Sequence, residues 1–375
     1  MQAFYWMYFC SLFSYANSFL SSKGFTVSQI GAVLAISSIL AVIIQPYIAK
    51  LLDKYETFTL KKSLLLSLGA SFIVTIPMLF TTNHIVLFIC YNIALCGLLT
   101  VQTYMYPFIF EYMNKGHKVN FGFARGFGSI SFAIASYFLG IVASKYSLHF
   151  FPKYFFVTCL IVIGIVFSFP TLQKDNTHKN KVKNDVSAKQ FFKHNKNFCF
   201  LLIGVVCLFY THNTFNTYLK NILESINYGI YEVGVCYLIA SMIEFPTMTL
   251  IPVLHKKFSY RTLFIVSSIG FTLKACILLL GVFSKSLALI YFSQLFQAFG
   301  FALYIPVSLY YVTQIVNKDE VVKAQAYLGT ALILGGILGN YISAEIAQLF
   351  SVNMVIISST IISAIGMLLF LKNSK

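Results

Sequence analysis

Two charged side chains lie in the middle of long apolar stretches, where an ionisable group is costly and is a candidate for function. Glu244 stands in ASMIEFPTM, and the proline two residues later, Pro246, is expected to kink a helix there. Because burial disfavours the charged form of a carboxyl group, Glu244 can take up and release a proton near neutral pH. Lys274, in GFTLKACILLL, must be paired or neutral if it is buried, and Glu244 is its natural partner. A purely structural ion pair is the alternative.

A third charge, Arg125, lies among glycines and phenylalanines in FGFARGFGSISFA, and it is one of two arginines in the chain. A phosphate-binding loop would follow a strand and carry Lys-Ser/Thr, whereas this stretch opens an apolar helix. The glycines at 122, 126 and 128 predict a flat face for close helix packing. Lysine supplies nearly every other cation, so an arginine here indicates that its fixed planar fork matters.

Three further polar residues are candidates for a solute cavity, and each has a structural alternative. Gln297, in QLFQAFGF, can donate and accept hydrogen bonds. His212 shares a polar stripe with Asn213 and Asn216, although its helix neighbours could equally satisfy it. Glu111 ends an apolar stretch, and a charge at that position often only reaches toward the interface.

The elements that carry these residues are predicted to be membrane-spanning helices. Of the 375 residues, 58% are hydrophobic and 10% are charged, whereas a soluble domain has about 25% charged residues. Stretches of roughly 20 apolar residues, long enough to cross the bilayer as helices, recur along the chain. We predict an all-α integral membrane protein whose twelve spans cover residues 3–21, 28–52, 62–82, 85–110, 122–144, 151–170, 197–219, 232–254, 260–283, 286–314, 322–349 and 352–371.

The net charge of +16 follows from how the cations are distributed between the two sides of the membrane. With the N-terminus inside, the inner loops, the span ends beside them and the C-terminal tail hold 21 of the 27 Lys and Arg residues. This is the positive-inside pattern, and it predicts that both termini are cytoplasmic. Nucleic acid is therefore not an expected partner, while membrane lipid is, and we expect a monomer.

The spans are expected to form two related six-helix bundles, at 1–170 and 197–375. Between them, residues 171–196 carry seven lysines and are predicted to be a solvated cytoplasmic linker beside an anionic leaflet, with a dedicated binding segment as the alternative. A shift of 203 residues superposes Gly31 on Gly234. Two such bundles, related by an axis along the membrane normal, are a known transporter plan.

Metal and cofactor sites find no support in the sequence. The eight cysteines all fall within predicted spans, none forms a CxxC pair, and no Cys/His cluster has zinc-ligand spacing. A membrane enzyme should show His, Asp or Ser clustered at one membrane face, and no such cluster occurs. We therefore expect no cofactor, no metal and no enzymatic activity.

Three stretches of the sequence resemble the major facilitator superfamily. QPYIAKLLDKY, at the end of the second span, is similar to its conserved loop and closest to the lactose permease form. FGFARGFGSISFA resembles the start of the fifth helix in that permease and in the 3-phenylpropionic acid and nucleoside transporters, and SQIG at 28–31 resembles the entry to span two. The resemblance covers essentially the whole chain.

The resemblance implies proton-coupled uptake of a sugar, nucleoside or small aromatic acid. Arg125 matches the substrate-binding arginine, and Phe132 matches a sugar-stacking tryptophan. Asp53, followed by Lys54, matches the conformationally important loop aspartate. Lys274 falls where the family has an arginine linked to proton transfer, and Glu244 matches the acid of the eighth helix.

The chain also departs from the permease at three positions. Gln297 and Gly300 replace the histidine and glutamate of the tenth helix, and Pro107 replaces the substrate-binding acid of the fourth, one turn from Glu111. Lactose specificity is therefore not expected, and Glu244 is the remaining candidate for the proton carrier. We predict a proton symporter for a small polar or aromatic solute in the cytoplasmic membrane of a bacterium. Efflux by proton antiport on the same fold, or a non-transporting scaffold or sensor, are the alternatives.

Overall fold

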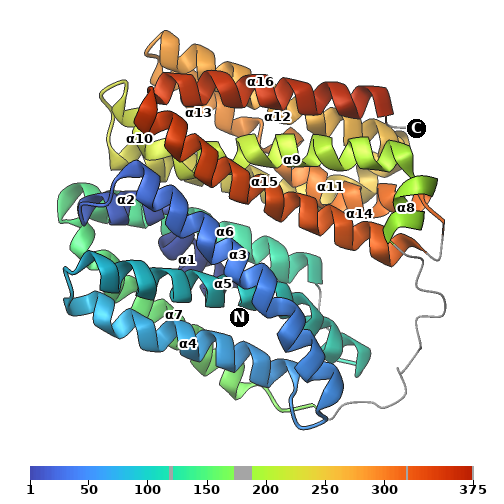
Figure 1. Ribbon diagram of the computed structural model, residues 1–375, viewed down its shortest axis with the longest axis horizontal. Coiled ribbons are helices and arrows are strands. Elements are labelled where there is room, and N and C mark those ends of the chain that lie inside the picture. The colour runs from blue at the N-terminus through green and yellow to red at the C-terminus, as the bar shows by residue number, and fades with distance from the viewer. Residues whose placement is uncertain (118–120, 173–187, 318–319, 374–375) are drawn as a thin grey trace. The chain divides into compact units, whose positions relative to one another are not determined.

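The computed structural model describes residues 1–117, 121–172, 188–317 and 320–373 (Figure 1). The chain divides into two compact units, Met1–Lys181 and Val182–Lys375, and in the described part every regular element is helical. The first unit contains α1 (Gln2–Phe9), η1 (Cys10–Ser14), α2 (Ala16–Ser22), α3 (Val27–Lys54), α4 (Leu60–Phe80), α5 (His84–Asn114), α6 (Phe121–Lys145), η2 (Leu148–Phe150) and α7 (Phe151–Ser168). The second contains α8 (Ala188–His194), α9 (Lys196–Thr217), α10 (Leu219–Glu224), α11 (Ile230–Lys257), α12 (Tyr260–Phe283), α13 (Leu287–Leu295), η4 (Ala298–Ala302), α14 (Leu303–Ile315), α15 (Val321–Leu349) and α16 (Val352–Asn373).

Eleven of the expected spans are helices long and apolar enough to cross a membrane, counting only the described residues. The expected first span is present as three consecutive short segments, α1, η1 and α2. The tenth span is also interrupted, because α13 ends at Leu295 and the π-helical η4 leads into α14. The all-helical fold is confirmed, and the described part of the chain has breaks in the first and tenth spans and near the end of the seventh, at Tyr218.

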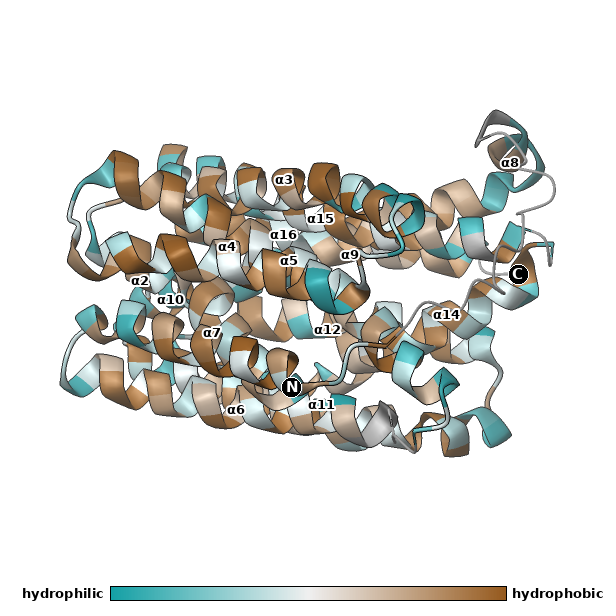
Figure 2. Cartoon of the chain, turned by 90° about the horizontal axis from the view of Figure 1, so that it is seen from below, coloured by the Kyte–Doolittle hydropathy of each residue, from teal (hydrophilic) through white to brown (hydrophobic). Residues whose placement is uncertain are grey.

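The outer faces of the helices are apolar, as a bilayer requires. Large hydrophobic side chains are exposed all along the spans; Ile73 and Leu280, for example, are 64% and 61% exposed. In Figure 2 the hydrophobic residues run along the outside of α3, α4, α5 and α7 within the first unit. Exposed apolar surface of this extent is unfavourable in water, whereas the hydrocarbon of a bilayer is the matching environment for it.

The first two spans of each unit repeat with a constant shift of 203 residues. Helices α3 and α11 both have 28 residues, and their first and last residues are separated by this shift. The third helical residue of each reaches back to the residue before the helix: the Gln29 Oε1 accepts from the Thr26 N–H at 2.9 Å, and the Glu232 Oε2 accepts from the Gly229 N–H at 2.9 Å. This half of a capping box fixes the same starting point in both helices.

The break in the opening helix of each unit also repeats, and it falls on a tyrosine. Tyr15 precedes α2 with φ −95° and ψ 11°, and Tyr218 precedes α10 with φ −99° and ψ 12°. Each hydroxyl donates to a backbone carbonyl of the fifth span of its own unit, Ser136 at 2.7 Å and Asn340 at 2.6 Å. The repeated geometry supports a duplicated six-helix plan.

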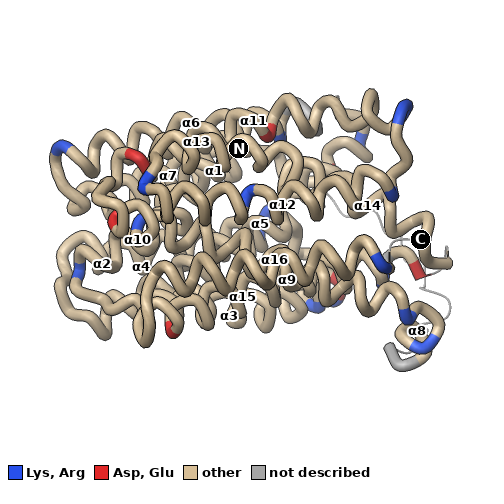
Figure 3. The backbone as a smooth tube through the Cα atoms, turned by 90° about the horizontal axis from the view of Figure 1, so that it is seen from above, with Lys and Arg blue, Asp and Glu red and all other residues tan. Residues whose placement is uncertain are grey.

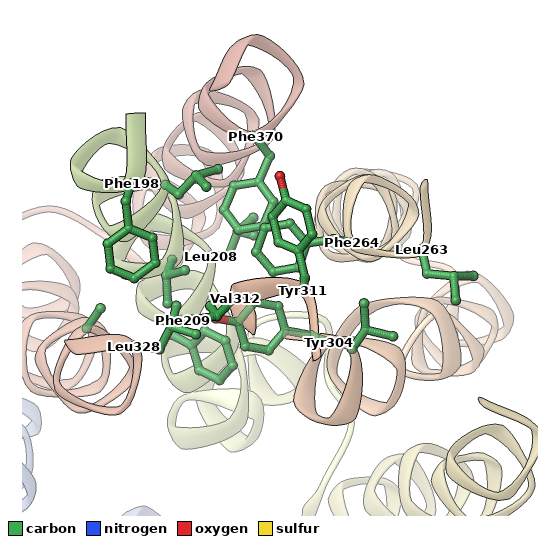
Figure 4. Close-up of a cluster of buried hydrophobic side chains, with 14 of the residues drawn as sticks. Phe198, Leu208, Phe209, Leu263, Phe264, Tyr304, Tyr311, Val312, Leu328 and Phe370 are labelled. Carbon is green, nitrogen blue, oxygen red and sulfur yellow. The ribbon is translucent and has the colours of Figure 1, made fainter. Parts of the chain in front are cut away.

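The second unit has an aromatic core between α9, α12, α14, α15 and α16 (Figure 4). Phe264 stacks on Phe370 with ring centroids 4.4 Å apart. Phe191 belongs to the same core and is fully buried, although it lies in the segment predicted to be a solvated linker. The reason is local: α8 carries Phe191 and Phe192 as an apolar pair, and both rings pack on Tyr327 of α15.

Candidate functional site

Three polar side chains from three membrane-spanning segments form a buried hydrogen-bonded chain in the second unit. Lys274 Nζ of α12 donates to Gln297 Oε1 at 2.8 Å, and Gln297 Nε2 donates to Glu244 Oε1 of α11 at 2.9 Å. The three residues are 5%, 5% and 8% exposed. We refer to Glu244, Gln297 and Lys274 as the buried triad.

The discontinuity of the tenth span positions Gln297 at the centre of this triad. Gln297 lies between α13 and the π-helix η4, where the regular helical ladder is interrupted. On α12, one turn before Lys274, Gly270 allows η4 to approach closely: a Cβ there would lie 2.6 Å from the Phe299 carbonyl carbon. Local π-helical segments are common at functional sites, and discontinuous spans frequently form transporter sites.

The order of groups in the triad is dictated by their hydrogen-bonding chemistry. An ammonium group only donates and a carboxylate only accepts, so the glutamine oxygen faces Lys274 and its nitrogen faces Glu244. Two opposite charges are thereby connected through a neutral dipole, which compensates part of the cost of burying them. The sequence predicted a Glu244–Lys274 pair with Gln297 facing the solute; the structure links all three residues through the amide.

His212 of α9 lies in an aromatic cluster close to the buried triad. Its ring stacks on Phe301 of η4, with centroids 4.7 Å apart and an interplanar angle of 7°. Phe271, one turn before Lys274 on α12, meets the same imidazole edge-on at 5.8 Å. Residues three apart share a helix face, so His212 and the triad face the same side of α12.

The hydrogen bonds of His212 leave one ring nitrogen available. The Asn216 amide nitrogen lies 3.1 Å from Nε2, and because an amide nitrogen donates, this contact assigns the imidazole proton to Nδ1. Nδ1 is buried and has no hydrogen-bond partner in the described part of the chain. Such a donor costs free energy unless a bound group accepts from it.

In the first unit, Arg125 of α6 is held by two neutral groups. Its guanidinium carbon lies 4.5 Å from the centroid of the Trp6 ring of α1, and Nη1 donates to Ser129 Oγ at 3.0 Å. The Trp6 indole nitrogen donates to Gln2 Oε1 at 2.9 Å, which fixes the ring orientation. The planar fork of the arginine is therefore held in a fixed orientation.

Gly128 makes this arrangement possible. A Cβ at position 128 would lie 2.4 Å from Trp6 Cδ1, so any larger residue would displace the indole ring. The predicted close packing is thus present at Gly128, and Gly126 is buried as well. The surroundings of Gly122 lie outside the residues that the structure describes.

The remaining predicted residues occupy separate positions in the first unit. Phe132 is half-buried on α6, two turns after Arg125 and on the same helix face. Glu111 is half-buried in the last turn of α5, which continues past the predicted end of that span. Asp53 and Lys54 are exposed at the end of α3, where Lys54 Nζ lies 5.2 Å from the Tyr55 ring.

Two aromatic residues of the site escaped the sequence analysis. Trp6 was detectable in principle, since it is the only tryptophan of the chain and lies in an apolar stretch. Phe301 gave no signal, because one phenylalanine among 39 is not distinctive. Both contacts join residues far apart in sequence, which spacing along one helix cannot reveal.

Charged residues gather toward the helix ends in Figure 3, with few in between. No group of three or more His, Cys, Asp or Glu residues among the described ones has the geometry to hold a metal ion.

The family of the chain follows from a comparison with family models. The model of the MFS_1 like family matches residues 1–357. The chain therefore belongs to this family and is a multi-pass membrane protein of a major facilitator transporter family. A search of curated protein sequences finds no match.

Solved structures share the fold at low sequence identity. The nucleoside transporter NupG is similar in a mutant form, with a TM-score of 0.82, 17% identity, and coverage of 100% of this chain and 98% of that one. Another NupG structure gives 0.80 at 16% identity, with the same coverage. A bacterial homologue of the human lysosomal transporter Spinster, inward-facing and occupied, gives 0.72 at 12% identity, covering 100% and 95%. The major facilitator fold is thus confirmed.

Proposed function

We propose that the protein is a proton symporter that moves a small polar or aromatic solute across the cytoplasmic membrane of a bacterium by alternating access. The observation that carries this proposal is the buried triad, in which a carboxylate and an ammonium group are linked through one amide. A buried, compensated charge pair in a membrane-spanning bundle is costly and is typical of proton relays.

Protonation of Glu244 is the step that would couple proton movement to conformational change. With Glu244 ionised, the Gln297 amide is polarised between the two charges and holds α11, α12 and the break of the tenth span together. A neutral Glu244 attracts the amide less and leaves Lys274 without its countercharge. The packing of η4 against α12 then becomes less favourable. Protonation of Glu244 would therefore shift the equilibrium between two arrangements of this interrupted span.

Arg125 would bind the solute in the first unit. Trp6 of α1 packs on its guanidinium group, and Phe132 lies on the same face of α6. A guanidinium group stacked on an indole offers a planar hydrogen-bonding fork for carbonyl, hydroxyl or carboxylate oxygens. Glu111 would contribute from α5. In the second unit, His212 Nδ1 would donate to the solute, and solute binding would alter the hydrogen bonds of Gln297.

These groups and the structural relatives support a proposal for the solute class. A ring with polar substituents suits an arginine, a histidine donor and aromatic side chains. The fold of the chain is similar to that of NupG, described as a nucleoside transporter, so a nucleoside is the first candidate to test. Asp53 and Lys54 would act at the loop that changes during the transport cycle, both termini would be cytoplasmic, and the protein would work as a monomer.

Transport in proteoliposomes tests the proposal. Purified protein is reconstituted, and uptake of labelled uridine, lactose and 3-phenylpropionic acid is measured with an inward, an outward and no proton gradient. We expect accumulation of one of these solutes only with the inward gradient. Accumulation driven by the outward gradient would instead establish efflux by antiport, and no accumulation of any solute across a wider panel would contradict transport.

A further inference from the structure

A polar cavity lies at the end of the second unit where α9 begins and where α14 and α16 end. Its volume is about 530 Å³. It is formed within this unit by residues of α8, α9, α14 and α16 and of the turn before α9, among them Lys193, Lys196, Asn197, Phe198, Gln314 and Ile315. We refer to it as the basic pocket.

The rim of the basic pocket is suited to an anion. Lys193 and Lys196 are exposed, so their ammonium groups can move onto a ligand. Asn197 and Gln314 add amide donors, and α9 presents the positive end of its dipole by beginning at Lys196. Figure 3 shows basic residues along α8, which forms one side of this pocket.

The base of the pocket is apolar. Phe198 and Leu201 are buried on α9, and the half-buried Ile315 at the end of α14 packs against the same apolar cluster. A ligand that fills both parts must therefore combine an anionic group with an apolar portion. An inorganic anion would satisfy only the rim.

The pocket is held in place by contacts that do not involve its lysines. Asn195 Nδ2 lies 3.1 Å from the Phe191 carbonyl oxygen and 3.1 Å from Glu320 Oε2. The same carboxylate oxygen lies 3.4 Å from Asn317 Nδ2. Phe191 anchors α8 by packing edge-on against Phe198, with centroids 5.7 Å apart. The nearby acid is thus engaged by two amides, and the segment that carries Lys193 is fixed on the bundle.

We propose that the basic pocket binds the phosphate group of an anionic phospholipid. The helices α9, α14 and α16 belong to membrane-spanning segments, so their shared end lies at the membrane surface, where such headgroups are concentrated. Basic pockets between spanning helices are suited to phosphate-bearing headgroups, and the apolar base accepts the glycerol and upper acyl chain. This site goes beyond the proposed transport and does not depend on which solute is carried.

Native mass spectrometry of the full-length protein tests this site. Delipidated protein is titrated with phosphatidylglycerol, with phosphatidylcholine and with inorganic phosphate. We expect the protein to retain phosphatidylglycerol in preference to phosphatidylcholine. The double variant Lys193→Gln/Lys196→Gln should bind phosphatidylglycerol about 30-fold more weakly, because each of the two lysines is expected to contribute about 5-fold to the affinity.

A matched control removes two exposed lysines from the same end of the unit. Helix α11 runs antiparallel to α9, because the Tyr237 hydroxyl near the start of α11 donates to the Asn216 carbonyl near the end of α9. The last residues of α11, Lys256 and Lys257, therefore lie at the same end of the unit as the basic pocket. Lys256→Gln/Lys257→Gln should leave lipid retention unchanged. If the double pocket variant does not fold, the single variant Lys196→Gln replaces it, with an expected loss of about 5-fold.

Three outcomes would overturn the proposal. The first is equal weakening by both lysine pairs, which would indicate general surface charge. The second is equal retention of the two lipids. The third is lysine-dependent binding of inorganic phosphate without preference for phosphatidylglycerol, which would identify a site for a soluble anion.

Discussion

The two units repeat the same helix plan but equip it with different polar groups. In the first unit, Arg125 is held by an indole face and a hydroxyl, both of which are neutral. In the second, Glu244 and Lys274 are compensated through Gln297. The first unit thus holds a fixed cation among neutral groups, whereas the second unit holds two opposite charges that are joined through an amide.

This difference indicates how one duplicated scaffold can serve two tasks. A guanidinium group does not lose its proton in a protein, so Arg125 can recognise a solute but cannot carry a proton. A buried carboxylate can change its protonation state, and the energy of the surrounding charges changes with it. The proposed division assigns solute recognition to the first unit and proton coupling to the second.

The largest expected effect comes from breaking the buried triad. Lys274→Met leaves Glu244 and Gln297 buried without their cation, and we expect a loss of about 3–5 kcal/mol in the free energy of unfolding. Thermal unfolding in detergent measures this loss. Adding Glu244→Gln should restore much of the stability, because it removes the uncompensated charge; a double variant as unstable as the single one would show that the two residues are not energetically coupled.

A smaller effect is expected where Trp6 packs on α6. Gly128→Ala places a methyl group against the indole ring and should cost about 1–3 kcal/mol by overpacking. Because Trp6 is the only tryptophan, its fluorescence maximum should shift as well. Gly164→Ala on α7 is the control, since a Cβ there meets nothing within 4 Å. Identical fluorescence of both variants would contradict the Trp6–Gly128 contact.

Arg125→Lys keeps the positive charge but removes the planar guanidinium group, and so tests which of the two solute binding requires. We expect roughly 10-fold weaker solute binding, because lysine loses the planar hydrogen bonds and much of the stacking on Trp6. Binding is measured by isothermal titration with the solute identified by transport. Arg261→Lys changes the other arginine, which is exposed at the start of α12, and should leave the affinity unaltered. Equal affinities for Arg125→Lys and the unmodified protein would remove Arg125 from the solute site.

The smallest effect is expected at His212. His212→Phe keeps the ring stacked on Phe301 but removes the Nδ1 donor, so KM should rise about 2–10-fold, the value of one hydrogen bond. The pH profile of uptake should not change. His255→Phe is the control, since this exposed ring also stacks on an aromatic neighbour, Tyr260. A shifted pH profile for His212→Phe alone would show that His212 takes part in proton handling.

Much of the helical plan could be predicted from the sequence because an apolar stretch of membrane length has one stable conformation in lipid. The bounds of α12, predicted at 260–283, agree with the structure. The interruptions at Tyr15, at Tyr218 and near Gln297 were not predicted. None of them directly adjoins a glycine or proline, and all depend on contacts with other helices. Helix α8 was missed because its two phenylalanines adjoin a lysine-rich stretch.

The candidate site was only partly predictable for a related reason. Glu244, Lys274 and Arg125 were identifiable because a charge in an apolar stretch is conspicuous. That Gln297 lies between two of them could not be predicted, since it is 53 residues from Glu244 and 23 from Lys274. Long-range geometry of this kind depends on the close approach of η4 to α12 at Gly270, which is a property of packing.

The central claim, that Glu244 couples transport to protons, is tested most directly by uptake and exchange with Glu244→Gln in proteoliposomes. We expect this variant to exchange solute across the membrane but not to accumulate it with an inward proton gradient. Glu224→Gln, which removes an exposed carboxylate paired with Lys220 at 3.4 Å, should accumulate normally. Accumulation by Glu244→Gln with an unchanged pH dependence would contradict the account.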